Sequence, residues 1–297
     1  MTLKKILLGT VAAVVMSASS TAQEQDVEVK TEALRGALHV LYGQGGNIGV
    51  SVGEDGVFII DDQYAFLTDK IKAAITKISD KEIRYVINTH FHGDHTGGNE
   101  NMGEGGTVIV AHDNVRQRLS AGSFVKAFNM KTGPAPKVAL PTVTFNDEMS
   151  LHLNGEEARI IHVSGAHTDG DSIIHFKGSN IIHMGDLFFN ELFPFIDVPN
   201  GGSIGGMIVG ADKALAAAND ETIIIPGHGP VTDKAGLMKY RTMLAGARTA
   251  VAALKEKGMS LEDVRAADPL AAYKGDFKGF NAEWHNMFIG FVYDSLK

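Results

Sequence analysis

The sequence has 297 residues, of which 44% are hydrophobic, and a formal net charge of −8 at pH 7. This length allows one large domain or two small ones with an ample apolar core, and the acidic balance argues against nucleic acids and anionic membranes as partners. The absence of cysteine excludes disulfides, a thiol nucleophile and thiolate metal ligands.

The first residues have the pattern of a secretory signal peptide. Lys4 and Lys5 precede a short apolar run at residues 6–16, and small residues follow up to Ala22. The run is too short to span a bilayer comfortably, and no later segment approaches the roughly 20 apolar residues that a spanning helix needs. We therefore expect cleavage of residues 1–22 and export, periplasmic or secreted, without membrane attachment. Cleavage removes two lysines and no acidic residue, which brings the net charge to −10.

The mature chain, residues 23–297, has no linker or repeat that would mark a second domain. Glycine-interrupted apolar runs between residues 38 and 52 indicate hairpin-linked strands. A buried strand at residues 57–60 and an amphipathic helix at residues 66–78 lead to a second buried strand at residues 85–88. This strand, helix, strand unit predicts a single α/β domain.

The elements beyond residue 100 are predicted in the same way, strands from short apolar runs and helices from apolar residues at helical spacing. Residues 121–137 contain glycines and prolines and have weak periodicity, which indicates an irregular loop able to overhang a site as a lid. The other expected elements are strands at 107–111, within 143–163, at 172–176, 180–184 and 222–225, and helices at 114–120, 204–215, 237–254 and 284–291.

The most informative stretch directly follows the strand at residues 85–88. It places three histidines and one aspartate within six residues, as His90, His92, Asp94 and His95. Imidazole nitrogens and carboxylate oxygens are the ligands that zinc takes when no thiolate is available. The spacing therefore predicts a metal site rather than a surface loop that happens to contain histidines.

Three later loops also place a histidine or an aspartate at the end of a short apolar strand. Ligand sites of open α/β sheets lie beyond the carboxyl ends of the strands, so we expect these loops to converge with the first one. Seven ligands exceed the four of one tetrahedral zinc and suit two metals that share a carboxylate and a water molecule. The candidate ligands are His90, His92, Asp94, His95, His167, Asp186 and His228.

These motifs, in this order, resemble those of the metallo-β-lactamase superfamily of hydrolases. The motifs are residues 90–95 followed by Thr-Gly-Gly-Asn, the His167 loop, Gly185-Asp186 and Pro226-Gly227-His228-Gly229, and the resemblance covers about residues 40 to 235. It implies a four-layer αββα sandwich with the site at one edge of two facing sheets.

The resemblance also implies two zinc ions, with iron or manganese as alternatives, and a division of the ligands between them. One metal would be held by His90, His92 and His167, the second by Asp94, His95 and His228, and Asp186 would bridge both. Family members of this pattern use a metal-bound hydroxide as nucleophile, because zinc lowers the pKa of bound water from 15.7 to about 7. Asp94 would orient this hydroxide or carry a proton to the leaving group.

Several other residues have two interpretations. Asp61 matches an acidic position that often supports the ligands in this superfamily, but it also suits a turn. The phenylalanine-rich residues 187–197 must be partly core, and the rest is a candidate apolar wall for a substrate. The remaining histidines are expected to be structural, and His183, three residues from Asp186, has the best claim to another role.

The substrate is less sharply indicated. The lack of cysteine excludes lactamases that use one at the second zinc. An aspartate at the bridging position, here Asp186, is typical of hydroxyacylglutathione thioesterases, lactonases, phosphodiesterases and RNA-processing nucleases. Lactamases whose second metal takes two histidines and an aspartate usually lack it. In addition, no lysine follows Asp186 closely to hold the carboxylate of a lactam. The acidic charge and the export signal argue against RNA, and glutathione thioesters are mainly cytosolic.

We therefore expect an exported dinuclear zinc hydrolase that cleaves a small acyl compound such as a lactone, ester, thioester or lactam. The alternative enzyme is a dedicated β-lactamase. Two other classes of protein stay open. One is a di-iron redox protein, although no flavin-binding domain is fused, and the other is a non-catalytic metal-binding protein. The expected partner is a small-molecule substrate, and no pattern indicates an oligomeric state.

Overall fold

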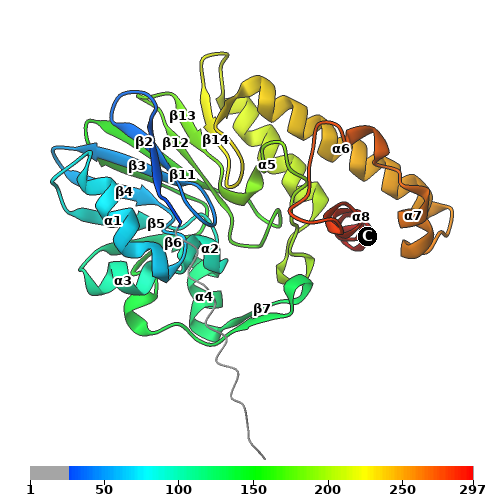
Figure 1. Cartoon of the computed structure of the whole chain (residues 1–297), viewed down its shortest axis with the longest axis horizontal. Coiled ribbons are helices and arrows are strands. Elements are labelled where there is room, and N and C mark those ends of the chain that lie inside the picture. Colours follow the sequence, from blue (N-terminus) through cyan, green and yellow to red (C-terminus); the bar gives the residue numbers. More distant parts are fainter. Residues whose placement is uncertain (1–26, 297) are drawn as a thin grey trace, which may run out of the picture.

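Two β-sheets packed face to face form the centre of the molecule, with helices on both outer sides (Figure 1). The computed structural model describes residues 27–296. The expected signal peptide, residues 1–22, lies outside the described residues. Among the residues that are described, no helix combines the length and the apolar character needed to cross a membrane.

The first sheet combines an antiparallel part with a parallel part. Its seven strands lie in the order β1-β2-β3-β4-β5-β6-β9. The first four pair antiparallel, and β4, β5, β6 and β9 pair parallel, which requires crossover connections. The strands are β1 (Lys30–Ala33), β2 (Leu38–Tyr42), β3 (Ile48–Gly53), β4 (Gly56–Ile60), β5 (Ile83–Ile87), β6 (Val108–His112) and β9 (Val143–Phe145).

The second sheet takes its six strands in sequence order, from β10 to β15. All neighbours pair antiparallel except β13 and β14, which are parallel. As a result β11, β13 and β14 run in the same direction and end at the same edge. The strands are β10 (Glu148–Leu153), β11 (Glu156–His162), β12 (Ser172–Phe176), β13 (Ile181–His183), β14 (Ile223–Ile225) and β15 (Thr232–Asp233).

The alternation of side chains along β4 separates two layers of the core. Val57 and Ile59 pack on the outer side with α1 (Thr68–Thr76), whereas Phe58 and Ile60 face the second sheet. Successive side chains of a strand point to opposite faces, so an all-apolar strand is buried on both. The ring centroids of Phe58 and Phe176 lie 6.0 Å apart across the two sheets.

The outer face of the second sheet is covered by helices of the C-terminal half, which Figure 1 shows on the side opposite α1 and α3. Side-chain oxygens of Ser203, Asp233 and Ser260 cap three of these helices. The expected four-layer αββα sandwich is thereby confirmed. The remaining helices are α2 (Gly93–Thr96), α3 (Asn99–Glu104), α4 (Asp113–Ala121), α5 (Ile204–Ala217), α6 (Lys234–Glu256), α7 (Leu261–Ala267) and α8 (Trp284–Ser295).

The prediction of an irregular loop at residues 121–137 is wrong. The segment forms a β-hairpin of β7 (Ser123–Val125) and β8 (Met130–Thr132), which extends along the lower side of the molecule in Figure 1. Asn129 at φ 50° completes the turn between the strands, a conformation that asparagine tolerates. Three-residue strands are too short for a clear period of two, which explains why the sequence pattern missed them.

Candidate metal centre

The seven expected ligands meet at the edge where strands of both sheets end. His90 and His92 follow β5, and Asp94 and His95 lie on the short helix α2. His167 lies in the loop after β11, and Asp186 in a 3₁₀ turn directly after β13. His228 follows β14. The parallel directions of these strands bring the four loops to one place, as expected for open α/β sheets.

One group of ligand atoms surrounds His92 Nδ1, which lies 3.2 Å from His90 Nε2 and 2.8 Å from His167 Nε2. The carboxylate oxygen Oδ2 of Asp186 completes the group at 3.4 Å from His167 Nε2 and 3.8 Å from His90 Nε2. All four residues are buried. Three imidazole nitrogens and one carboxylate oxygen thus point at a common centre.

The second group contains Asp94, His95 and His228. His228 Nε2 lies 3.3 Å from Asp94 Oδ2 and 3.4 Å from His95 Nε2. The other oxygen of Asp186, Oδ1, lies 3.1 Å from His95 Nε2 and 3.4 Å from His228 Nε2. Each carboxylate oxygen of Asp186 therefore faces one group.

These distances fit metal coordination. Tetrahedral zinc with Zn–N bonds of 2.0–2.1 Å separates its ligand atoms by about 3.3 Å, and the separations within the two groups range from 2.8 to 3.8 Å. Asp186 Oδ1 is also buried without a hydrogen-bond donor, which is costly for a carboxylate unless a cation compensates it. The two groups of residues fit a dinuclear metal site with Asp186 between the metals.

The electrostatics of the site agree with this assignment. Burial lowers the pKa of His90 well below its usual value and that of His167 to about 4, so both imidazoles are neutral with a free lone pair. Burial alone would raise the pKa of Asp186, but the imidazoles of His228 and His95 hold it well below its usual range. The ionised carboxylate attracts positive charge, which metal cations supply.

Asp61 orients one histidine of each group. Its Oδ2 lies 2.7 Å from His95 Nδ1 and accepts a 2.8 Å hydrogen bond from Thr89 Oγ1. Since this hydroxyl donates to Asp61, it accepts from His90 Nδ1 at 3.0 Å. Both rings therefore keep Nε2 free for a metal. Asp61 is fully buried at φ 63°, so the supporting role is favoured over a simple turn residue.

Asp197 orients the third histidine and was not singled out as a site residue from the sequence. Its Oδ2 lies 3.0 Å from His92 Nε2, which leaves His92 Nδ1 for the metal. Asn200 donates a 2.7 Å hydrogen bond to the same oxygen. Asp197 is 105 residues away from His92 in the chain, and no spacing rule connects the two.

The turn between β2 and β3 holds two of the ligand loops together. Asn47 Nδ2 donates to the carbonyl oxygens of Pro226 and Gly229 at 2.9 and 2.8 Å. Gly46 N donates to Asp94 O at 3.1 Å. A Cβ atom on Gly46 would overlap the His95 ring, and one on Gly227 would overlap Asp186 Oδ1. These two glycines are required by the close approach of the ligand side chains.

His183 lies outside the centre, despite its position near Asp186. Its Nε2 is 3.1 Å from Asn47 O, and its Nδ1 accepts from Gly185 N at 3.2 Å. Burial lowers the pKa of His183 to about 4, so a neutral, fully hydrogen-bonded ring is expected. The other expected structural histidines are likewise absent from the two ligand groups found among the described residues.

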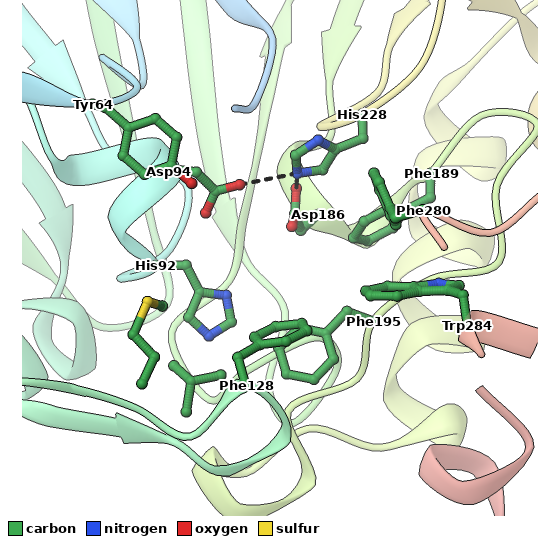
Figure 2. A pocket seen from close by; sticks show the side chains of 12 residues that line it. Tyr64, His92, Asp94, Phe128, Asp186, Phe189, Phe195, His228, Phe280 and Trp284 are labelled. Atoms are coloured by element: carbon green, nitrogen blue, oxygen red, sulfur yellow. Dashed lines mark ion pairs between the residues drawn. The ribbon is translucent and has the colours of Figure 1, made fainter. Parts of the chain in front are cut away.

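A cavity of about 300 Å³ opens beside the ligands. Figure 2 shows Asp94, Asp186 and His228 on one side of it and aromatic rings on the other. All four phenylalanines of the phenylalanine-rich run are buried members of the core, and two of them, Phe189 and Phe195, also line the cavity. The hairpin of residues 123–132 contributes Val125, Phe128 and Met130, so the segment does lie beside the site.

Comparisons with known proteins point to one family. The family model described as "Metallo-beta-lactamase superfamily" matches residues 41–228. A linear primary-alkylsulfatase of Pseudomonas sp. is 24% identical over 74% of this chain and 50% of its own length. A hydroxyacylglutathione hydrolase of Pelagibacter ubique is 26% identical over 40% of this chain and 43% of its own length. The chain thus spans about half the length of the curated relatives it matches.

Solved structures of low sequence identity have the same fold. A metallo-β-lactamase from Pontibacter korlensis superposes with a TM-score of 0.59 at 15% identity, covering 73% of this chain and 99% of the other. A stereoselective inverting sec-alkylsulfatase from Pseudomonas sp. superposes with a TM-score of 0.64 at 16% identity, and the superposition covers 89% of this chain and 50% of the sulfatase.

The role of Asp61 gives a direct test of the centre. We expect Asp61→Asn to weaken metal binding 10- to 100-fold, because a single amide oxygen cannot accept from both Thr89 N, which donates to Asp61 Oδ1 at 2.7 Å, and His95 Nδ1, and the His95 ring loses its orientation. Asparagine tolerates the left-handed backbone, so the fold is retained. The measurement is competition for zinc against a chelator of known affinity.

Asp62→Asn is the matched control. Asp62 is equally buried, and its side chain accepts a hydrogen bond from Gly98 N rather than from a ligand side chain. Burial raises the pKa of Asp62 well above the usual value, so that the neutral amide resembles its native state. Its metal affinity should match the wild type. Equal affinities of the Asp61 and Asp62 variants would contradict the orienting role of Asp61.

Proposed function

We propose that the chain, which belongs to the metallo-β-lactamase superfamily, is a metal-dependent hydrolase that uses two zinc ions to cleave a small acyl substrate such as a lactone, ester, thioester or lactam. The observation that carries this proposal is the position of Asp186, whose two oxygens face two separate groups of ligands at the wall of a cavity. A purely structural metal site is closed by its ligands and leaves no room for a substrate.

The protein side chains have distinct tasks in this proposal. When bound, the two metals polarise the substrate carbonyl and make hydroxide available from water at neutral pH. Asp94 lies at the cavity with 23% of its side chain exposed, and the nearby imidazoles of His95 and His228 hold its pKa below the usual range against the effect of burial. It is therefore ionised, can accept a proton from water, and can pass it to the leaving group.

Tyr64 is the second polar group of the cavity with a task in this scheme. Its hydroxyl lies near Asp94 in Figure 2. Burial, assisted by the charge of Asp94, raises the pKa of Tyr64 to about 12. The phenol thus keeps its proton at neutral pH and can donate a hydrogen bond to a substrate oxygen as negative charge develops on it.

Removal of the Asp94 carboxylate tests the proton transfer. We expect Asp94→Asn, assayed at saturating zinc, to lower kcat 10²- to 10⁴-fold while KM changes only a few-fold, because general acid–base catalysis acts on the transition state. Zinc content must be measured in parallel, since Asp94 is also an expected ligand. Unchanged kcat in a fully metallated variant would remove the proton-transfer role.

Two other activities are candidates for the same centre. A dedicated β-lactamase is the alternative that the sequence motifs leave open, and the Pontibacter korlensis structure supports it through the fold alone. Sulfate-ester hydrolysis is favoured by the alkylsulfatase relative, whose likeness extends over 74% of this chain. The hydroxyacylglutathione hydrolases support thioester cleavage.

A small substrate panel separates these activities. We expect zinc-dependent turnover of hexyl acetate and of a six-carbon lactone, and no efficient turnover of hexyl sulfate or of a chromogenic cephalosporin, with His90→Ala as the blank. The two hexyl esters share their alkyl group, so the difference reports the scissile bond alone. If the wild type cleaves the cephalosporin and His90→Ala does not, the protein would be assigned as a β-lactamase instead of an acyl-ester hydrolase.

We also propose that the hydrolase is exported after cleavage of residues 1–22. The support is the sequence of that segment, with Lys4 and Lys5 before an apolar run and small residues up to Ala22. The lack of cysteine removes any dependence on disulfide formation outside the cytosol.

A further inference from the structure

We propose that the cavity selects substrates by an uncharged apolar group, an alkyl chain or an aryl ring, which binds to an aromatic wall opposite the metal centre. This inference rests on the proposed hydrolase function and specifies its substrate class. The aromatic wall consists of Phe128, Phe189, Phe195, Phe280 and Trp284. In Figure 2 these rings line the side of the cavity that faces away from Asp94 and Tyr64.

The wall is assembled from three distant segments of the chain. Phe128 lies in the turn of the β7–β8 hairpin, Phe189 and Phe195 follow the Asp186 turn, and Phe280 and Trp284 precede or begin α8. The wall also contacts the centre itself, because the Phe189 ring stacks on His228 at 5.1 Å and the Phe195 ring on His92 at 5.6 Å. A group bound to the wall would therefore lie next to the reacting bond.

The rings support one another and present carbon atoms to the cavity. Phe128 stacks on Trp284 with ring centroids 5.9 Å apart, and Phe280 meets Trp284 edge to face at 4.6 Å. The indole Nε1 of Trp284 donates a 2.8 Å hydrogen bond to Phe193 O. Its one polar group is thus satisfied away from the cavity, which leaves an apolar face for a ligand.

Apart from the metal centre, the cavity offers no cationic side chain to an anionic substrate group. Among the described residues that line it there is neither lysine nor arginine, and its charged groups all belong to the metal centre. Arg118 lines a second pocket instead, where its guanidinium donates two 2.7 Å hydrogen bonds to Asp169. A carboxylate placed against the wall would lose water without gaining a partner, which is costly.

Two rings at the cavity mouth keep large exposed areas. Phe128 is 44% and Phe280 is 49% exposed, although buried aromatic surface is what stabilises most folds. A ligand that covers these rings gains the free energy of apolar burial, which corresponds to about fourfold in affinity for each buried methylene. The cavity volume of about 300 Å³ suits a small molecule rather than a polymer.

Fluorescence of the protein reports binding to this wall directly, because Trp284 is the only tryptophan of the sequence. The zinc-loaded full chain is titrated with N-hexylacetamide and with 6-acetamidohexanoate, which differ by a carboxylate at the far end of the chain. We expect the uncharged amide to change the emission and to bind at least tenfold more tightly. Equal affinity, or tighter binding of the carboxylate, would overturn the inference.

Substitution of Phe128 shows whether the wall provides the preference. Phe128→Ala should weaken N-hexylacetamide binding about five- to tenfold, with little change for the charged analogue. Phe124→Ala is the matched control, since Phe124 lies on the same hairpin, is 45% exposed and does not line the cavity. Equal effects of the two substitutions would contradict a binding role of the wall.

The outcomes separate this inference from the proposed function. Acyl-ester turnover without preference for uncharged alkyl groups would refute the wall and leave the hydrolase assignment intact. Selective binding by a zinc-loaded protein that cleaves no acyl ester would keep the wall and refute the assignment of the scissile bond.

Discussion

A buried carboxylate between two groups of imidazoles is the constraint on which the rest of the site depends. Asp186 is 5% exposed, and its two oxygens face different groups of ligands. Such an anion is stable in the interior only if positive charge lies on both sides of it. The surrounding hydrogen bonds serve this requirement, because Asp61 and Asp197 direct imidazole lone pairs of both groups towards the places where cations would lie.

The sandwich fold supplies the precision that this arrangement needs. Ligands from both sheets meet because β5, β11, β13 and β14 all end at one edge. The interface between the sheets is apolar and close-packed, with Phe58 against Phe176, and it fixes the distance between the loops. Hydrogen bonds from the backbone of Gly46 and from the side chain of Asn47 then hold the Asp94 and His228 loops together. The aromatic wall adds a less rigid border, partly from an exposed hairpin.

The sequence could predict what depends on local pattern. Apolar periodicity predicted the α/β domain, and histidines and aspartates at the ends of short apolar strands predicted all seven residues that the structure brings together. The resemblance of these motifs to a known family implied the sandwich. Contacts between residues far apart in the chain left no such signal. Asp197 is 105 residues from His92, and the aromatic wall combines three segments. The hairpin at residues 123–132 was missed because its strands have three residues each, and Trp284 was expected only as part of a helix.

The central claim is that one chain holds two metal ions that share Asp186. The most direct test is the zinc content of the purified chain after reconstitution and removal of free metal, measured by elemental analysis together with protein concentration. We predict two zinc ions per chain, and a lower occupancy in Asp186→Asn because one shared ligand is lost. A wild-type protein that holds a single zinc, or an Asp186→Asn variant that holds two with unchanged affinity, would contradict this prediction.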